Sequence, residues 1–326
     1  MTDLPFDESE TMYDYVITVP GQGAHRPGML DSWLTEAPSA QELLDDWSEI
    51  TEFDLLAASR DTVALSDTAV AQPLITAAAL LSLERLRTRL DPPHSRVLYA
   101  GHSVGELAAA AGAGYLTPAT AIALARARGE AMSDACAMAP TGMAAFMPSK
   151  RNGAPDESIT DAIHAGGLSV ANWNGSHQFV AAGPLAAVEA FTADPPPGMR
   201  VVRLEVAGAF HSSAMAPARE SFARAVAEAP FQTPDSAMLG NRDGALVAGP
   251  GDLRQRLVTQ LISAVRWDLC AESIVQHSSA EALHIELAPA GPLTKLAQRA
   301  RPEARTLALR AAEDLDRVPA LVGSGA

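Results

Sequence analysis

The sequence predicts an α/β protein with two parts: a large α/β-hydrolase-like domain built on a parallel sheet, and a small ferredoxin-like domain inserted into it. Three observations support this fold class. Hydrophobic residues make up 48% of the 326 residues and aromatic residues only 5%, so the core is rich in Ala, Leu and Val, which favours helices packed on a parallel sheet. A strand, a tight turn and a helix follow one another at 96–112. Further on, the order β-α-β-β-α-β occupies roughly 65 residues.

The first part of the large domain follows an acidic stretch, residues 1–13, that is expected to form a flexible leader. Its first strand ends directly before Pro-Gly-Gln-Gly at 20–23. Thr117 and Pro118 provide the N-cap and first-turn proline of its last helix. In chain order, the strands and helices expected here are 15–19, 38–49, 69–90, 96–100, 106–112 and 118–135.

The pattern changes at about residue 140. The β-α-β-β-α-β elements are expected at 143–147, 157–164, 168–171, 178–182, 185–192 and 201–206. This order predicts a ferredoxin-like unit. Alternating helices and strands then resume at 214–228, 237–239, 250–263 and 282–287. We therefore expect a discontinuous catalytic domain, 1–138 and 208–326, with the insertion at 139–207.

Charge and composition exclude several classes of function. The net charge of −15 argues against a nucleic-acid partner. No apolar run approaches the roughly 18 residues of a membrane span, and the acidic amino terminus lacks the order of a secretory signal, so we expect a cytoplasmic protein. Cys136 and Cys270 have no metal-type spacing, and the eight histidines form no H-x-x-x-H pair. No metal and no permanently bound cofactor is expected.

Gly-His-Ser-Val-Gly at 101–105 has the form of a nucleophile elbow. A sharp turn between strand and helix exposes the hydroxyl of Ser103, and it requires residues without bulk at Gly101 and Gly105. The turn leaves the backbone N–H of Val104 at a helix N-terminus, where it can stabilise an oxyanion. A glycine-rich structural turn is the alternative reading of the pattern.

A serine nucleophile needs a base, and His211 is the best candidate because it lies in a loop between a strand and a helix. From the pattern alone, an ordinary loop histidine remains an alternative. In α/β-hydrolases the acid precedes a histidine near the chain end, whereas here about 115 residues follow His211 and no acidic residue is in an obvious orienting position. The order suggests a Ser–His pair whose imidazole is oriented by something other than a carboxylate.

Seven segments, taken together and in order, are similar to the motifs of malonyl-CoA:acyl carrier protein transacylases, most closely the actinobacterial-type enzymes of fatty acid synthesis. The resemblance extends from about residue 15 to 318. The segments are Pro-Gly-Gln-Gly at 20–23, Asp-Thr-Ala-Val-Ala-Gln-Pro at 67–73, Gly-His-Ser-Val-Gly-Glu at 101–106, Arg-Gly-Glu-Ala-Met at 128–132, Gly-Ala-Phe-His at 208–211, Asn-Arg-Asp-Gly at 241–244, and Gln260-Leu261 through Val265-Arg266-Trp267.

The resemblance implies a role for several residues. Ser103 resembles the acylated nucleophile and His211 its base. Gln22 and Val104 match the positions whose backbone N–H groups form the oxyanion hole. Gln260 matches a position whose backbone carbonyl orients the histidine, which would explain the missing acid.

Two further residues concern the substrate. Arg128 resembles the residue that binds the free carboxylate of the malonyl group, and a guanidinium can do so through two parallel charge-assisted hydrogen bonds. Phe210, in Ala209-Phe210, resembles the malonyl-selecting form of the family, in which a bulky side chain disfavours an extra methyl group. From the sequence alone, Arg128 could instead be a solvent-exposed residue of a helix, and Phe210 an ordinary core residue.

The implied substrate is the CoA thioester malonyl-CoA and the implied partner is acyl carrier protein, with no membrane involved. Because acyl carrier proteins are acidic, docking requires a local basic surface on this acidic chain. The candidates are Lys150, Arg151, Lys295, Arg299 and Arg301.

The chain departs from the family pattern at a few positions. His25 replaces a usual glutamine, His177 a usual glycine, Ser263-Ala264 a usual Asn-Pro or similar pair, and Lys295 a common glycine. Three other functions remain open: a discrete acyltransferase of a polyketide pathway, a serine thioesterase or hydrolase, and a non-catalytic interaction protein.

Overall fold

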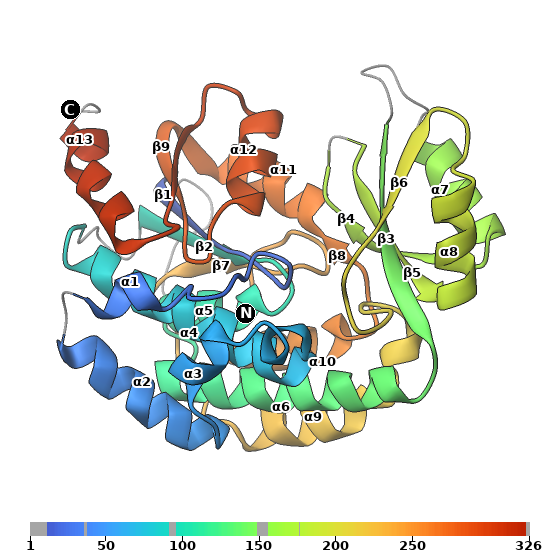
Figure 1. The fold of residues 1–326 in the computed structure, drawn as a ribbon. Helices are drawn as coiled ribbons and strands as arrows, with labels where there is room; N and C mark the ends of the chain where they lie inside the picture. The colour runs from blue at the N-terminus through green and yellow to red at the C-terminus, as the bar shows by residue number, and fades with distance from the viewer. Residues whose placement is uncertain (1–11, 36–37, 91–95, 149–155, 176, 324–326) are drawn as a thin grey trace.

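The computed structural model describes residues 12–323 except 36–37, 91–95, 149–155 and 176, and it contains two sheets of five strands each. Most of the helices cover the first sheet, and the second sheet lies beside it with two helices of its own (Figure 1). The architecture confirms the predicted α/β fold class.

The first sheet has the order β10-β9-β1-β2-β7, and every neighbouring pair is parallel. Its strands are β1 (Tyr13–Val19), β2 (Val97–Gly101), β7 (Ala237–Leu239), β9 (Ser278–Glu286) and β10 (Arg305–Ala308). Because parallel strands end at one edge, the loops that follow β1, β2 and β7 meet there. Tyr13 is buried in β1, so the strand begins inside the range expected for the leader.

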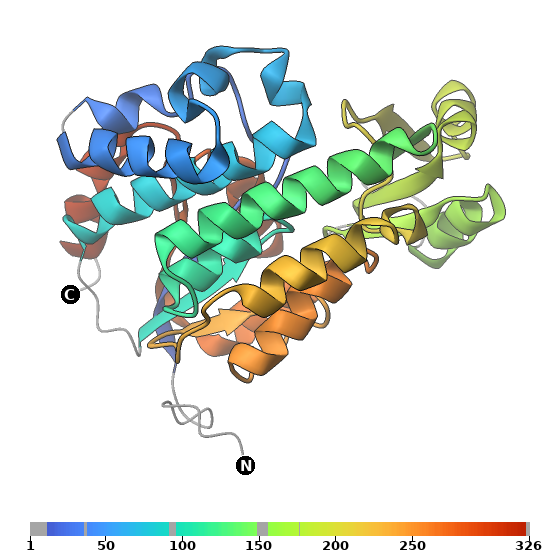
Figure 2. The ribbon, with the colours of Figure 1, turned by 90° about the horizontal axis from the view of Figure 1, so that it is seen from below.

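Ten α-helices that precede β10 accompany this sheet within the described part of the chain. They are α1 (Asp31–Leu34), α2 (Pro38–Thr51), α3 (Leu55–Arg60), α4 (Thr68–Arg87), α5 (Gly105–Gly112), α6 (Pro118–Ala137), α9 (Ala218–Glu228), α10 (Pro250–Gln260), α11 (Trp267–His277) and α12 (Pro292–Ala300). A last helix, α13 (Val318–Gly323), follows β10. Figures 1 and 2 show α6 running from this group of helices toward the second sheet.

The second sheet has the order β6-β3-β5-β4-β8. Its strands are β3 (Thr141–Pro148), β4 (Ser169–Trp173), β5 (Phe179–Pro184), β6 (Met199–Arg203) and β8 (Val265–Arg266), and its helices are α7 (Asp156–Ala165) and α8 (Leu185–Ala193). The first four strands are antiparallel neighbours in the ferredoxin-like order. The fifth, β8, comes from outside the expected insertion and pairs with β4 in parallel. The boundaries 139 and 207 remain a prediction.

Three features of the elements differ from the sequence-based expectation. The helix expected at 214–228 is a 3-10 turn at Ser213–Met215 and then α9, with Pro217 as the N-cap of α9. The helix α4 is long and apolar enough to cross a membrane, contrary to the expectation for apolar runs, but 83% of that window is buried inside the protein. It is therefore the central core helix of the large unit. Several short elements, including β8, β10, α3 and α12, were not expected from the sequence.

The elbow after β2 depends on two glycines. A Cβ atom on Gly101 would lie 2.1 Å from the carbonyl carbon of Gly105, and one on Gly105 would lie 2.3 Å from the carbonyl oxygen of Val19. Both distances are far shorter than van der Waals contact, and both neighbours are backbone atoms that cannot rotate away. The turn and its packing against β1 therefore require glycine at both positions, as the sequence predicted.

Gly101→Ala should lower the free energy of unfolding by about 3 kcal/mol or more, because the new methyl group overlaps the first turn of α5. Urea unfolding followed by circular dichroism measures the loss. Gly251→Ala in α10 is the matched control, since a Cβ there has no neighbour within 4 Å. An equal effect of the two substitutions would contradict the close packing of the elbow.

Candidate active site

Ser103 and His211 lie in hydrogen-bond contact. Ser103 stands at the turn after β2 in the left-handed region, with φ of 55°, and His211 has φ of 57° in the segment between β6 and α9. The distance between Ser103 Oγ and His211 Nε2 is 2.7 Å. The structure thus brings together two side chains that are 108 positions apart in the chain.

The second ring nitrogen of His211 fixes its tautomer. Nδ1 lies 2.9 Å from the backbone carbonyl oxygen of Gln260, and because a carbonyl only accepts, Nδ1 carries the hydrogen. Nε2 therefore has a free lone pair and accepts the hydroxyl hydrogen of Ser103. Burial, and next the charge of Arg128, lower the pKa of His211 to about 3, so the ring is neutral at pH 7 and able to take up a proton.

Arg128, on α6, is almost fully buried and its guanidinium faces the serine. Its Nη2 donates to Ser103 Oγ at 3.2 Å and to Gln260 Oε1 at 2.8 Å, and its Nη1 donates to Gln72 Oε1 at 2.8 Å. Its Nε has no hydrogen-bond partner among the described residues. Burial lowers the pKa of Arg128 to about 10, which still leaves it positively charged at pH 7. A buried cation with only neutral hydrogen-bond partners suits an anionic ligand.

Close packing of α4 and α6 places Arg128 and Gln72 opposite each other. Gly129 permits this approach, because a Cβ there would lie 2.7 Å from the carbonyl oxygen of Thr68. Thr68 in turn accepts a hydrogen bond from Gln22 Nε2 at 3.3 Å, so the loop after β1 is attached to the start of α4. The helix pair therefore connects the guanidinium to the loop that carries Gln22.

Of the two predicted oxyanion-hole positions, Val104 lies in the elbow and Gln22 in the loop that follows β1. Among the hydrogen bonds of the described residues, the N–H groups of Val104 and Gln22 have no acceptor. The loop of Gln22 lies against the elbow, since a Cβ on Gly21 would be 2.7 Å from the carbonyl oxygen of His102. The departure at His25 supports this loop: its Nδ1 accepts from the N–H of Gly23 at 3.2 Å, while its Nε2 donates to the carbonyl oxygen of Leu65 at 3.1 Å.

Besides Gln72, two residues in this site were part of recognised motifs but had no expected role. Asn241 follows β7, accepts the N–H of Ser103 at 2.8 Å and donates to the carbonyl oxygen of Gly101 at 2.7 Å. Glu106, in the first turn of α5, is buried and accepts from the N–H of Asn241 and from Gln260 Nε2, both at 2.6 Å. Their place in the motifs was the only signal in the sequence.

The remaining expected residues lie around the site or outside the described residues. Phe210 is buried beside His211, with its N–H bonded to the carbonyl of Gly208. His177 has φ of 60°, a conformation that suits the glycine usual at that position. No group of three His, Cys, Asp or Glu residues in the described part of the chain could hold a metal ion.

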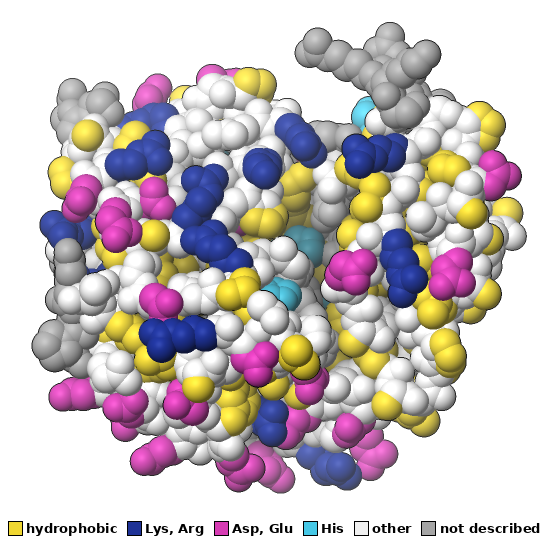
Figure 3. Space-filling model, viewed as in Figure 1, with side chains coloured by type: hydrophobic (Ala, Val, Ile, Leu, Met, Phe, Trp, Pro, Cys, Tyr) yellow, Lys and Arg dark blue, Asp and Glu magenta, His cyan; other side chains and the backbone are white. Residues whose placement is uncertain are grey.

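The basic candidates for partner docking are only partly described. Lys150 and Arg151 lie outside the described residues. Arg299 donates to Gln178 Oε1 at 3.0 Å and so joins α12 to the second sheet's β4–β5 loop, whereas Arg301 donates to the carbonyl oxygen of Ala280. Figure 3 shows a hollow between the two parts of the molecule, with histidine at its floor and Lys and Arg side chains around its upper rim.

Comparison with known proteins identifies the family. Residues 15–310 match the acyl transferase domain family. The chain belongs to this family. It is 40% identical over 302 residues to the malonyl CoA-acyl carrier protein transacylase of Mycobacterium tuberculosis (strain H37Rv), covering 92% of this chain and 97% of the relative. A crystal structure of MCAT from Mycobacterium tuberculosis has a TM-score of 0.87 and 40% identity, covering 93% of this chain and 99% of that one.

A type I polyketide synthase of phenolphthiocerol synthesis from Mycobacterium marinum is 32% identical over 288 residues, which cover 85% of this chain but only 13% of the synthase. The same acyltransferase domain thus also occurs inside much longer proteins. These comparisons confirm the resemblance to malonyl-CoA:acyl carrier protein transacylases and the expectation of an acyltransferase enzyme.

Buried neutral histidines predict a pH-dependent stability of this acyltransferase. Burial lowers the pKa of His102 and His284 to about 4 and that of His211 to about 3, so between pH 6.5 and 4 the unfolded chain binds protons that the folded one does not. The folded state therefore loses stability on acidification. Glu106 has the opposite effect, because burial raises its pKa to about 7 and the folded state then holds a proton that the unfolded state releases. It is one carboxyl group against three histidines, so the loss of stability on acidification remains. Urea unfolding between pH 7 and 5 should show a loss of about 1 kcal/mol or more per pH unit.

His284→Leu should reduce that slope and raise stability at pH 5, because His284 Nε2 is buried without a partner in the described structure. His164→Leu, at an exposed position of α7, is the control and should leave the slope unchanged. An unchanged slope in His284→Leu would contradict the assignment of the pH dependence to buried histidines.

Proposed function

We propose that this enzyme transfers the malonyl group of malonyl-CoA to the phosphopantetheine thiol of acyl carrier protein through a malonyl-Ser103 intermediate, and that it supplies fatty acid synthesis. One observation carries the proposal: the buried guanidinium of Arg128 lies 3.2 Å from the oxygen of Ser103. An acyl group bound to that oxygen therefore has a cation within reach of its far end. The names of the relatives support the same substrate and partner.

In the first half-reaction, Ser103 Oγ attacks the thioester carbonyl carbon while its proton moves to His211 Nε2. The carbonyl oxygen takes the negative charge and is stabilised by the N–H groups of Val104 and Gln22. The C–S bond then breaks, and CoA leaves as a thiol with the proton from His211. The neutral tautomer of His211, fixed by the carbonyl of Gln260, is the form that this step requires.

In the second half-reaction, the carrier protein's thiol gives its proton to His211 and attacks the malonyl ester carbonyl. The ester C–O bond breaks, and Ser103 recovers the proton. The outcome depends on a thiol rather than water reaching the ester, and a hydrolase with the same elbow would show the opposite preference. The rim of Lys and Arg side chains in Figure 3 suits an acidic carrier protein, with Lys295 and Arg299 as candidate contacts.

The structure refines the expected role of Arg128. Without substrate its two terminal nitrogens already donate to the amide oxygens of Gln72 and Gln260, so a neutral acyl group would not leave it wholly unpaired. A malonyl carboxylate replaces neutral partners by charge-assisted hydrogen bonds, each worth roughly 1.5–3 kcal/mol. This difference is the proposed source of the preference for malonyl over acetyl groups. Phe210, buried beside the base, is the proposed barrier to a further methyl group.

We also place the enzyme in the cytoplasm, where malonyl-CoA and carrier proteins meet. A discrete polyketide acyltransferase is the second candidate, supported by the polyketide synthase relative, but the higher identity and fuller coverage of the stand-alone transacylases favour fatty acid synthesis.

Incubation with malonyl-CoA should add one malonyl group to the protein, located on Ser103 by intact mass and peptide mapping. The adduct should disappear when reduced acyl carrier protein bearing phosphopantetheine is added, and should be stable to water for much longer. Ser103→Ala is the control and should gain no mass. Rapid loss of the adduct to water, with no transfer to the carrier protein, would make the protein a hydrolase.

Arg128→Ala should lower the rate of Ser103 acylation by malonyl-CoA about 100-fold and largely remove the preference over acetyl-CoA, because two charge-assisted hydrogen bonds are lost. Arg126→Ala is the matched control on the same helix, since Arg126 pairs with Glu130 away from the serine. A malonyl preference that survives in Arg128→Ala would show that another group binds the carboxylate.

A further inference from the structure

Glu106 is a buried acid that the acyl-transfer steps do not use. It is 1% exposed and lies three positions after the nucleophile, in the first turn of α5. Its oxygens accept from the backbone N–H of Asn241 and from Gln260 Nε2, each at 2.6 Å. Both contacts are short, and an ionised carboxylate makes shorter and stronger hydrogen bonds than a neutral acceptor.

The first of these contacts supports the nucleophile. The side chain of Asn241 accepts the N–H of Ser103 and donates to the carbonyl oxygen of Gly101, so it holds both sides of the elbow. Glu106 fixes the backbone from which that side chain extends. The position of the serine oxygen thus depends on Glu106 through one intermediate residue.

The second contact supports the base and the guanidinium together. Gln260 orients His211 with its backbone carbonyl and Arg128 with its side-chain oxygen. The side-chain amide of Gln260 has an acceptor oxygen at one end and a donor nitrogen at the other. Its oxygen can face Arg128 only if acceptors on the opposite side bind its nitrogen. The acceptors of that nitrogen are Glu106 Oε2 at 2.6 Å, Asn241 Oδ1 at 3.1 Å and the carbonyl oxygen of Ser103 at 3.2 Å.

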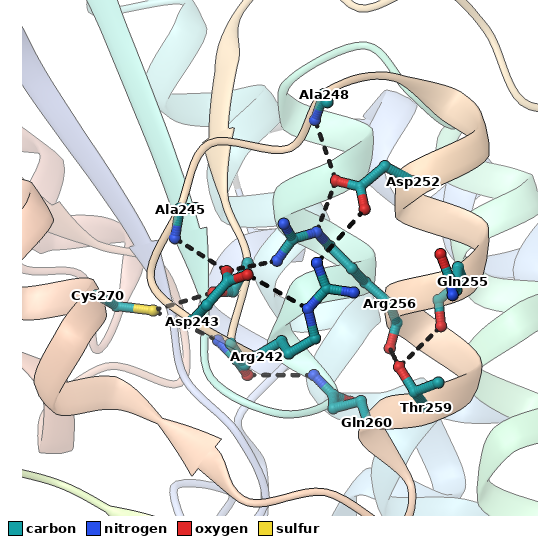
Figure 4. A network of polar contacts seen from close by, with 12 residues as sticks. Arg242, Asp243, Ala245, Ala248, Asp252, Gln255, Arg256, Thr259, Gln260 and Cys270 are labelled. Carbon is teal, nitrogen blue, oxygen red and sulfur yellow. Dashed lines mark hydrogen bonds and ion pairs between the residues drawn. The ribbon is translucent and has the colours of Figure 1, made fainter.

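An ion-pair network holds the two partners of Glu106 in one rigid unit. Arg256, on α10, is buried and pairs with Asp243 and Asp252 at 2.6 Å each, so the loop that carries Asn241 is attached to the helix that carries Gln260 (Figure 4). The contact is close, since a Cβ on Gly240 would lie 2.8 Å from Arg256 Nη1. Glu106 then connects this unit to the elbow helix.

We propose that Glu106 is a positioning residue: its carboxylate sets the orientation of the Gln260 amide and thereby aligns the guanidinium of Arg128 and the imidazole of His211 with Ser103. This inference rests on the proposed acyl transfer. It adds Glu106 as the residue that determines acyl selection, through the orientation of Arg128 by Gln260. Among the described residues, the Ser–His pair has no acid of its own, and Glu106 acts in place of one indirectly: it contacts Gln260, which in turn contacts His211.

Glu106→Gln tests the proposal with almost no change in shape. An amide has one acceptor oxygen, but Glu106 faces two donors, so the new NH₂ group must oppose one of them. When it opposes Gln260, that amide rotates and turns its own NH₂ toward Arg128. We expect the preference for malonyl-CoA over acetyl-CoA in Ser103 acylation to fall about tenfold or more, with a loss of about 100-fold in the acylation rate.

Glu286→Gln is the matched control. Glu286 has the same 1% exposure and accepts from the N–H groups of Leu293 and Thr294 at the start of α12, and none of the hydrogen bonds of the described residues joins it to Ser103, Arg128 or Gln260. It should lose stability without a change in the malonyl-to-acetyl ratio. If Glu106→Gln keeps the wild-type ratio and rate, or if Glu286→Gln changes the ratio equally, the positioning role is wrong.

A sulfonyl fluoride that labels activated serines separates this inference from the proposed function, because labelling requires an aligned Ser103–His211 pair but no malonyl group. Wild-type protein that is labelled but never malonylated would overturn the proposed function; slower labelling of Glu106→Gln, by about tenfold or more, would still support the positioning role. Equal labelling of the wild-type protein and Glu106→Gln, together with an unchanged acyl preference, would overturn the positioning role of Glu106.

Wild-type protein provides the test if Glu106→Gln does not fold. Protonation of Glu106 turns one of its two acceptor oxygens into a hydroxyl donor, so one acceptor is lost, as it is in Glu106→Gln. Burial raises its pKa to about 7, opposed by the N–H of Asn241 and the charges of Arg128 and Arg256 and assisted by that of Asp243. The malonyl-to-acetyl ratio should therefore fall between pH 8 and 6, where Arg128 stays charged and His211 neutral. A constant ratio over this range would overturn the proposal.

Discussion

Gln260 makes the interaction on which the rest of the site depends. Its backbone carbonyl accepts from His211 Nδ1 at 2.9 Å, and its side-chain oxygen accepts from Arg128 Nη2 at 2.8 Å. A neutral group thus orients both the base and the guanidinium. No carboxylate among the described residues contacts the imidazole, and burial and the nearby cation keep His211 neutral. The guanidinium of Arg128 has only neutral hydrogen-bond partners beside Ser103, so the site favours an acyl group that carries its own negative charge.

The fold serves this arrangement by bringing distant segments to one edge of a parallel sheet. The loops after β1, β2 and β7 carry Gln22, Ser103 and Asn241, while α6 and the end of α10 supply Arg128 and Gln260. The close approaches are possible only because glycines stand at the contacts, at the elbow and between α4 and α6. The second sheet lies on one side of the hollow in Figure 3, and β8, which follows α10 in the chain, pairs with its strand β4 (Figures 1 and 3).

Much of the fold and the site could be predicted from the sequence, because local patterns carry it. The glycine spacing around Ser103 reports a steric requirement, and the strand and helix order of the second sheet reports its topology. Two-residue β8 is too short to have a pattern, and the contacts that define the roles of Glu106 and Asn241 join positions 135 apart. No local rule could have told that the side chain of Gln260, expected to act through its backbone, also orients Arg128.

In the proposed reaction, hydroxyl, imidazole and guanidinium act together on one acid-bearing acyl group. A high-resolution crystal structure of the malonylated enzyme tests it most directly. We predict an ester on Ser103 whose carbonyl oxygen lies at the N–H groups of Val104 and Gln22 and whose carboxylate accepts two hydrogen bonds from Arg128. A malonyl group whose carboxylate points into solvent, with Arg128 still bonded to Gln72 and Gln260, would contradict it.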